Sequence, residues 1–178
     1  TTASDNTAIG FGSLSTNVIG TRNVAVGSLT LQENTTDDNT AVGYNTLCAN
    51  TTGTRNTAMG SLALDTNTTA SDNTAFGYNS LTENTTGTRN TAMGSLALDS
   101  NTTASDNTGV GYNALTANIT GLQNTAVGSL ALDSSTLASN NVAIGYSSLT
   151  ANTTGAQNVA LGAFSLQLAT TASDNTAI

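Results

Sequence analysis

The sequence contains no proline, tryptophan, histidine or lysine, and several of these absences exclude a class of function. Without histidine, the chain lacks the most common general base and the most common metal ligand among side chains. Three arginines against eleven acidic residues give a net charge of −8, which excludes the cationic surface that nucleic-acid binding requires. No apolar run approaches the length of a membrane span. We therefore predict no cofactor, no metal, no nucleic-acid partner and no membrane insertion.

Bulky side chains are also scarce. Aromatic residues make up 4% of the chain and charged residues 8%, whereas threonine, asparagine, alanine, serine and glycine account for 119 of the 178 residues. Polar sequence of such low complexity is often disordered. A single cysteine, Cys48, cannot form an internal disulfide. Only the order of residues along the chain distinguishes a disordered tract from a repetitive fold.

That order is a repeat with a period of 17 residues. An asparagine that opens an NTAVG-type segment recurs at spacings of 17, with one spacing of 16, at residues 6, 23, 39, 56, 73, 90, 107, 124, 141, 158 and 175. Ten units fill residues 6–174, with a partial unit at each end. A fixed short period is typical of stacked repeat architectures. We expect one continuous array over 1–178 that is an excerpt of a longer protein.

Counted from its asparagine as position 1, each unit keeps the same residue types in the same places. Position 2 is threonine or valine, position 3 is alanine except at Gly109, position 4 is apolar, position 5 is glycine and position 9 is leucine. The unit is too short for a pair of helices, and its β-branched residues favour strands. We predict an all-β, parallel β-solenoid (β-roll) with one 17-residue coil per unit. Each coil should contain a strand over positions 1–5, a second strand over positions 8–13 and a return turn over positions 14–17.

Two positions supply the predicted core. Strand side chains alternate between faces, so we expect the apolar residue at position 4 and the leucine at position 9 to point inward. Positions 1, 3 and 5 then form a flat outer face of small side chains that a neighbouring chain can approach closely. The structural residues that follow from this register are Leu47, Leu64, Leu81, Leu98, Gly60, Gly77, Asn73 and Asn90.

A second period of 34 residues is superimposed on the first. Alternate coils carry an aromatic residue at position 6, and the coils between them carry serine or alanine there. The last position of each coil alternates between aspartate and arginine from Asp5 to Asp106. Coils of 17 residues stack each arginine between two aspartates, whereas coils of 34 residues would stack like charges. We therefore predict a solvent-facing charge ladder that includes Arg55, Asp72, Arg89 and Asp106.

The polar residues permit functional interpretations beside structural ones. Most acidic residues stand singly, unlike the gathered oxygen ligands of calcium loops. Neither Cys48 nor any hydroxyl has a histidine or lysine to activate it, so we predict no catalytic residue and no enzymatic activity. N-x-T sequons follow the coil register, which favours a ladder of stacked asparagines over glycosylation. They lie at Asn34, Asn50, Asn67, Asn84, Asn101, Asn118 and Asn152.

Two rows of surface residues can each be interpreted in two ways. Threonines at positions 13 and 14 could contact ice or ordered water, although strand propensity also explains them. The aromatic residues at position 6 could stack on the sugar rings of a cell-surface glycan, or could pack over neighbouring serine and leucine side chains. The candidate surface ladder consists of Tyr44, Tyr78, Tyr112 and Tyr146.

The units NTAVGYNTLCANTTGTR and NTAFGYNSLTENTTGTR resemble the NTAVGYxAL…NTTG repeats of fibrous bacterial and phage tail-fibre-like proteins, which often precede an intramolecular chaperone domain. More distantly, NTAIG and NVAIG are similar to the SVAIG coils of trimeric autotransporter adhesin heads. The resemblance covers essentially the whole chain. It implies a left-handed parallel β-roll, with three chains side by side, exposed outside the cell or virion. The units here are longer than typical adhesin-head coils.

The leading hypothesis is therefore a structural segment of an extracellular fibre, the shaft of an adhesin or of a tail fibre. Repetition without a unique site suits a spacer better than a catalyst. The expected partner is the chain itself, as a homotrimer or as a filament stacked end to end. The alternative hypothesis is a binding module that uses a regular Thr/Asn face or the Tyr ladder for ice or glycan.

Overall fold

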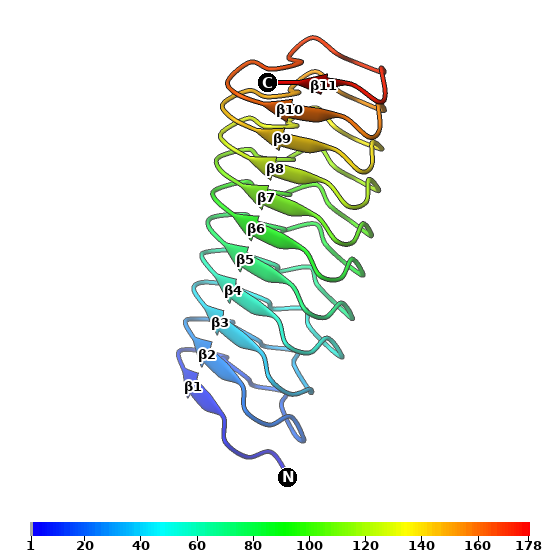
Figure 1. The fold of residues 1–178 in the computed structure, drawn as a ribbon. Coiled ribbons are helices and arrows are strands. Elements are labelled where there is room, and N and C mark those ends of the chain that lie inside the picture. The colour runs from blue at the N-terminus through cyan, green and yellow to red at the C-terminus, as the bar shows by residue number, and fades with distance from the viewer. Residues whose placement is uncertain (1) are drawn as a thin grey trace.

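The structure, a computed structural model that describes residues 2–178, is a rod of stacked coils with the chain ends at opposite ends of the rod (Figure 1). Eleven parallel strands pair in chain order into one sheet, and the all-β solenoid predicted from the 17-residue period is confirmed. The strands are β1 (Thr7–Ile9), β2 (Val24–Val26), β3 (Thr40–Val42), β4 (Thr57–Met59), β5 (Thr74–Phe76), β6 (Thr91–Met93), β7 (Thr108–Val110), β8 (Thr125–Val127), β9 (Val142–Ile144), β10 (Val159–Leu161) and β11 (Thr176–Ala177).

Equivalent positions of successive coils lie directly above one another. The 16-residue coil that begins at Asn23 keeps this register, because Ala25 still pairs with Ala41. Its missing residue belongs to the return turn. The Asn34 side chain closes that turn on the carbonyl of Thr36, two residues on, whereas Asn50 reaches the carbonyl of Gly53, three residues on. The shorter turn therefore leaves the pairing of the strands unchanged.

Only one side of each coil is a strand, and the predicted second strand over positions 8–13 is wrong. Positions 6–11 form turns. The leucines at position 9 have φ between 49° and 57°, and positions 7 and 17 lie in the same left-handed region, which is incompatible with an extended strand. Backbone hydrogen bonds still join the coils on this side; for example, the Leu81 N–H donates to the Ala97 carbonyl (3.0 Å). We call positions 2–4 the strand wall and positions 6–12 the turn wall.

A glycine corner connects the two walls. Gly77 has a φ of 137°, and a Cβ atom there would lie 2.5 Å from the carbonyl oxygen of Gly94 in the next coil. Any larger residue would therefore push the stacked backbones apart. The close approach accounts for glycine at position 5 from Gly10 to Gly145, whereas at Gly162 only the backbone conformation requires it.

The interior is lined by positions 3 and 9 and not by positions 4 and 9. The leucines at position 9 from Leu31 to Leu149 are fully buried, as predicted, and so are the alanines at position 3 from Ala25 to Ala160. Position 4 points outward, with 40% of Met59 and 44% of Met93 exposed. The prediction of a buried position 4, and of an outer face at positions 1, 3 and 5, is therefore wrong by one residue of strand register.

The narrowness of the coil explains which face of the strand is buried. At Gly109, the one glycine at position 3, a Cβ atom would lie 3.3 Å from Cγ of Leu98. The position-9 leucine therefore crosses the interior from the turn wall and leaves room for a methyl group at most. Valine, methionine or phenylalanine must face outward, because close-packed interiors have no space for them.

Two buried asparagine ladders complete the interior. At position 1, the Asn90 backbone N–H donates to Oδ1 of Asn73 (2.9 Å), and Asn73 Nδ2 donates to the Gly87 carbonyl (2.9 Å). At position 12, Nδ2 of Asn84 donates to Oδ1 of Asn67 (3.1 Å). The sequon asparagines from Asn34 to Asn152 are fully buried. The predicted ladder is confirmed, and the folded chain does not present these side chains for glycosylation.

Candidate functional surfaces

The described residues offer surfaces and no enclosed site. No pocket is found in the part of the chain that the structure describes. Within residues 2–178 there is also no group of three or more histidine, cysteine, aspartate or glutamate side chains that could hold a metal. Nor does this range contain a helix with the length and hydropathy of a membrane span. Functional candidates are therefore columns of side chains that run along the rod.

The outer side of the strand wall is an apolar column flanked by β-branched residues. We call positions 2 and 4 of strands β1–β10 the strand face; it carries no charged side chain. Position 2 is partly buried in all of these strands except β1, whereas Met93 and Ile144 at position 4 are 44% and 42% exposed. The position-4 column consists of Ile9, Val26, Val42, Met59, Phe76, Met93, Val110, Val127, Ile144 and Leu161. This column was predicted to lie in the core, so the residue pattern did not indicate the surface.

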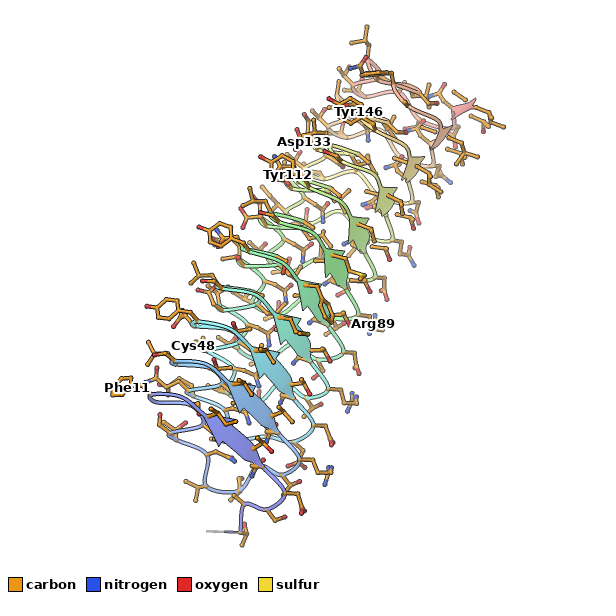
Figure 2. The ribbon with its side chains drawn as sticks, turned by 90° about the vertical axis from the view of Figure 1, so that its left-hand side faces the viewer. Phe11, Cys48, Arg89, Tyr112, Asp133 and Tyr146 are labelled. Atoms are coloured by element: carbon orange, nitrogen blue, oxygen red, sulfur yellow. The ribbon has the colours of Figure 1, made fainter. Side chains whose placement is uncertain are left out.

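The aromatic column lies just beyond the glycine corner. It comprises Phe11, Tyr44, Tyr78, Tyr112 and Tyr146, and the four tyrosines are 49–55% exposed. Figure 2 shows the labelled members, Phe11, Tyr112 and Tyr146, along one edge of the rod.

The backbone that carries each aromatic ring is fixed by the coil that follows it. The Leu96 N–H donates to the Tyr78 carbonyl (2.9 Å), and the Leu130 N–H donates to the Tyr112 carbonyl (2.9 Å). At the end of the column, Tyr146 meets the ring of Phe164 edge to face, with the centroids 5.2 Å apart. The next coil thus holds the backbone beneath each ring, and about half of the surface of each tyrosine is exposed to solvent.

The charge ladder faces solvent, as predicted. Nε of Arg55 lies 2.6 Å from Oδ1 of Asp72, and Nε of Arg89 lies 2.6 Å from Oδ1 of Asp106. These hydrogen bonds hold the pKa of both carboxyls below its usual value. Each arginine pairs with the aspartate of the next coil, and among residues 2–178 no ion pair joins it to the aspartate of the preceding coil. The ladder is therefore a series of separate pairs that favour the correct register of coils.

A second acidic column lies on the turn wall at position 10. Asp65, Asp99 and Asp133 occur in alternate coils, and burial raises the pKa of each carboxyl. Nδ2 of Asn45 donates to Oδ2 of Asp65 (3.3 Å). Cys48 shares this column, and burial also raises the pKa of its thiol. That shift favours the neutral thiol, which is the poor nucleophile of the two forms.

The threonine rows at positions 13 and 14 are partly used for structure. At position 13, the hydroxyl of Thr85 donates to the carbonyl of Thr102 (3.1 Å), and Thr51 makes the same bond to Thr68 (3.0 Å). At position 14, the row is interrupted by the exposed apolar side chains of Ile19 and Leu137. The position-13 hydroxyls therefore join coils to one another, and the position-14 row is not uniform.

No protein-family model, curated protein or solved structure matches this chain. The similarity to NTAVG-type fibre repeats thus stays a prediction from the sequence.

Proposed function

We propose that this chain is a structural segment of an extracellular fibre, the shaft of an adhesin or of a tail fibre, in which copies associate side by side through the strand face. The observation that carries the proposal is the unbroken apolar column at position 4, which runs through all ten coils on the outside of the rod. Exposed apolar surface of such extent typically marks an interaction site.

The shape of the column favours lateral association. A filament stacked only end to end leaves the whole strand face in water. A closed homotrimer turns three strand faces toward a common axis and covers each of them equally. Burial of partly exposed side chains such as Met59, Phe76 and Met93 then supplies the apolar area that a thin coil lacks on its own.

Variation in side-chain size argues against ice as the occupant of this face. Binding to a lattice requires a repeated flat surface, whereas position 4 passes from Val42 to Met59 to Phe76 in successive coils. Side chains of neighbouring copies can interdigitate around such differences. The resemblance of the repeats to fibre proteins supports the extracellular location, and the absence of any unique site along the repeat suits a shaft.

The test is the size of the particle in solution. We expect sedimentation velocity and light scattering to give a trimer for the native chain. Met59→Asp, Phe76→Asp and Met93→Asp combined should yield a monomer with an unchanged circular dichroism spectrum, because these side chains lie outside the core of the coil. The matched control places the same three charges in the same coils, at the exposed Thr69, Thr86 and Thr103, and should remain trimeric.

Two results would contradict this function. One is a native chain that stays monomeric at every concentration studied. The other is equal association of the strand-face variant and its control, which would place the contact between copies elsewhere on the rod.

A further inference from the structure

We propose that the aromatic column binds an extended β-1,4-linked polysaccharide without acidic groups, by stacking sugar rings on successive tyrosines. The inference does not rest on the fibre function, because the column lies beyond the glycine corner and outside the strand face. Three features carry it: the spacing of the rings, the hydrogen-bonded backbone beneath them and the charge around them.

The spacing of the tyrosines is set by the coils. Tyr44, Tyr78, Tyr112 and Tyr146 occupy position 6 of alternate coils. Because paired strands are about 4.8 Å apart, the rings recur about every 9.6 Å along the rod. In an extended β-1,4-linked chain of hexopyranoses, each ring is turned over relative to the next, so the same face recurs at every second ring. Two such rings span nearly the same length as two coils, and one disaccharide therefore matches one tyrosine.

The hydrogen-bonded backbone beneath the rings keeps this spacing constant. Each tyrosine carbonyl accepts a backbone hydrogen bond from the next coil, as Tyr44 does from Leu62 (3.0 Å) and Tyr78 from Leu96 (2.9 Å). The four rings have nearly equal exposure, between 49% and 55%. A tyrosine side chain has only two torsions to fix when it binds, so it loses little entropy, and its apolar ring faces stack on the C–H faces of sugars.

Serine hydroxyls alternate with the rings. The coils between the tyrosines carry Ser61, Ser95 and Ser129 at the same position, and all three are partly exposed. The column therefore reads ring, hydroxyl, ring, hydroxyl along the rod. A sugar that is turned over relative to its stacked neighbour presents its hydroxyl edge to the serine, which can donate and accept hydrogen bonds.

Charge selects the class of polysaccharide. The nearest charged column on the turn wall is acidic, with Asp65, Asp99 and Asp133, and all three arginines lie at position 17, in the return turn. An anionic glycan would meet repulsion and no arginine or lysine on this wall. Neutral chains such as cellulose, or amino-bearing chains such as chitosan, meet no such barrier.

The first measurement needs no mutation. The chain has no tryptophan, so its near-ultraviolet fluorescence comes mainly from the four tyrosines of the column. We expect titration with cellohexaose to change this fluorescence with a saturating isotherm, and maltohexaose, which is α-linked and curved, to leave it unchanged. Absence of any change with cellohexaose and chitohexaose would overturn the proposal, and so would an equal response to maltohexaose.

Depletion by microcrystalline cellulose then tests the residues. Tyr78→Ala with Tyr112→Ala should weaken binding about tenfold or more, whereas Tyr78→Phe with Tyr112→Phe should bind like the native chain, because the stacking face is retained. Leu122→Ala, an exposed apolar residue outside the column, should have no effect.

A register variant tests the spacing itself. Tyr78→Ser with Ser95→Tyr keeps the composition and the number of rings but moves one ring out of the two-coil series, which Tyr44, Tyr112 and Tyr146 still follow. We expect it to bind more weakly than the native chain and as weakly as Tyr78→Ser alone, because a ring that is out of phase adds no stacking contact. Full binding by this variant would overturn the proposed occupant. Loss of association between copies in the double alanine variant, without loss of cellulose binding, would overturn the site and assign the column to self-contact.

Discussion

The strand wall and the turn wall of each coil both carry a column of large apolar side chains, yet only the column on the turn wall is buried. On the turn wall, position 9 is leucine in every coil and is fully inaccessible from Leu31 to Leu149. On the strand wall, position 4 changes from valine to methionine, phenylalanine, isoleucine and leucine and stays partly exposed. Constancy of size among repeats therefore marks the interior of this protein, and apolar character alone does not.

The two walls also differ in the backbone structure that stacks one coil on the next. Strands of three residues pair in register on one side, whereas the other side is a chain of turns with left-handed residues at positions 7 and 9. The turns bring the leucine across the interior, and the strand contributes only an alanine methyl group. A change at position 9 of the turn wall should thus alter stability, and a change on the strand face should alter association.

The largest expected effect compares the two apolar columns directly. Leu81→Ala should lower the free energy of unfolding by about 2–5 kcal/mol, because it opens a cavity in a close-packed interior. Met93→Ala, on the exposed column, should cost the single chain less than about 1 kcal/mol. Denaturant unfolding, followed by circular dichroism at low protein concentration, measures both.

Protein concentration separates the two changes further. The effect of Leu81→Ala should be nearly independent of concentration, whereas that of Met93→Ala should grow as copies associate. Equal destabilisation by the two variants at low concentration would mean that the strand wall is buried on both faces.

A smaller effect is expected where the position-12 ladder is interrupted. Ser135 replaces asparagine there, and both Oδ1 of Asn118 and Oγ of Ser135 are buried without a hydrogen-bond partner. Ser135→Asn should continue the ladder and raise the free energy of unfolding by about 1 kcal/mol. The reverse change in the continuous ladder, Asn84→Ser, should lower it by a similar amount. Thermal unfolding of the two variants measures both changes in stability. An unchanged stability for Ser135→Asn would show that the buried oxygens of Asn118 and Ser135 already have hydrogen-bond partners.

The smallest expected effect is the dependence of stability on pH, which has opposite signs in the acidic column at position 10 and in the charge ladder at position 17. Burial raises the pKa of Asp99 in the folded chain, so its carboxyl destabilises the fold as pH rises through the unfolded pKa and toward the higher folded value. The hydrogen bond from Arg55 lowers the pKa of Asp72, so its stabilising contribution is lost as pH falls through the lower folded value.

Single asparagine substitutions separate these contributions. Compared with the native chain, Asp99→Asn should gain stability, and Asp72→Asn should lose stability, as the pH is raised from about 2 to about 7. Unfolding midpoints measured across this range check both signs. Parallel pH profiles for the two variants would contradict the assignment of one column to a buried site and the other to exposed ion pairs.

Several features of the fold follow from the sequence by itself. The spacing of the asparagines defines coils of 17 residues, and the alternation of Asp72, Arg89 and Asp106 requires that one such unit closes one coil, since a longer coil would stack like charges. Both the parallel in-register sheet and the stacking of asparagines into ladders result from identical residues lying above one another. The two-coil period of the aromatic column is also visible in the sequence, which left open whether its rings are exposed or packed over their neighbours.

Only the tertiary structure decided which side of the strand faces inward and what forms the opposite wall. In a strand of three residues, an alanine flanked by β-branched and apolar residues allows either face to be buried, and local preference does not choose between them. The choice depends on the width of the interior, which is fixed by Leu98 and its equivalents reaching across from the turn wall to within 3.3 Å of the Cβ position at Gly109. That reach in turn depends on left-handed leucines, a conformation that their side chains do not favour and that stacking against neighbouring coils imposes.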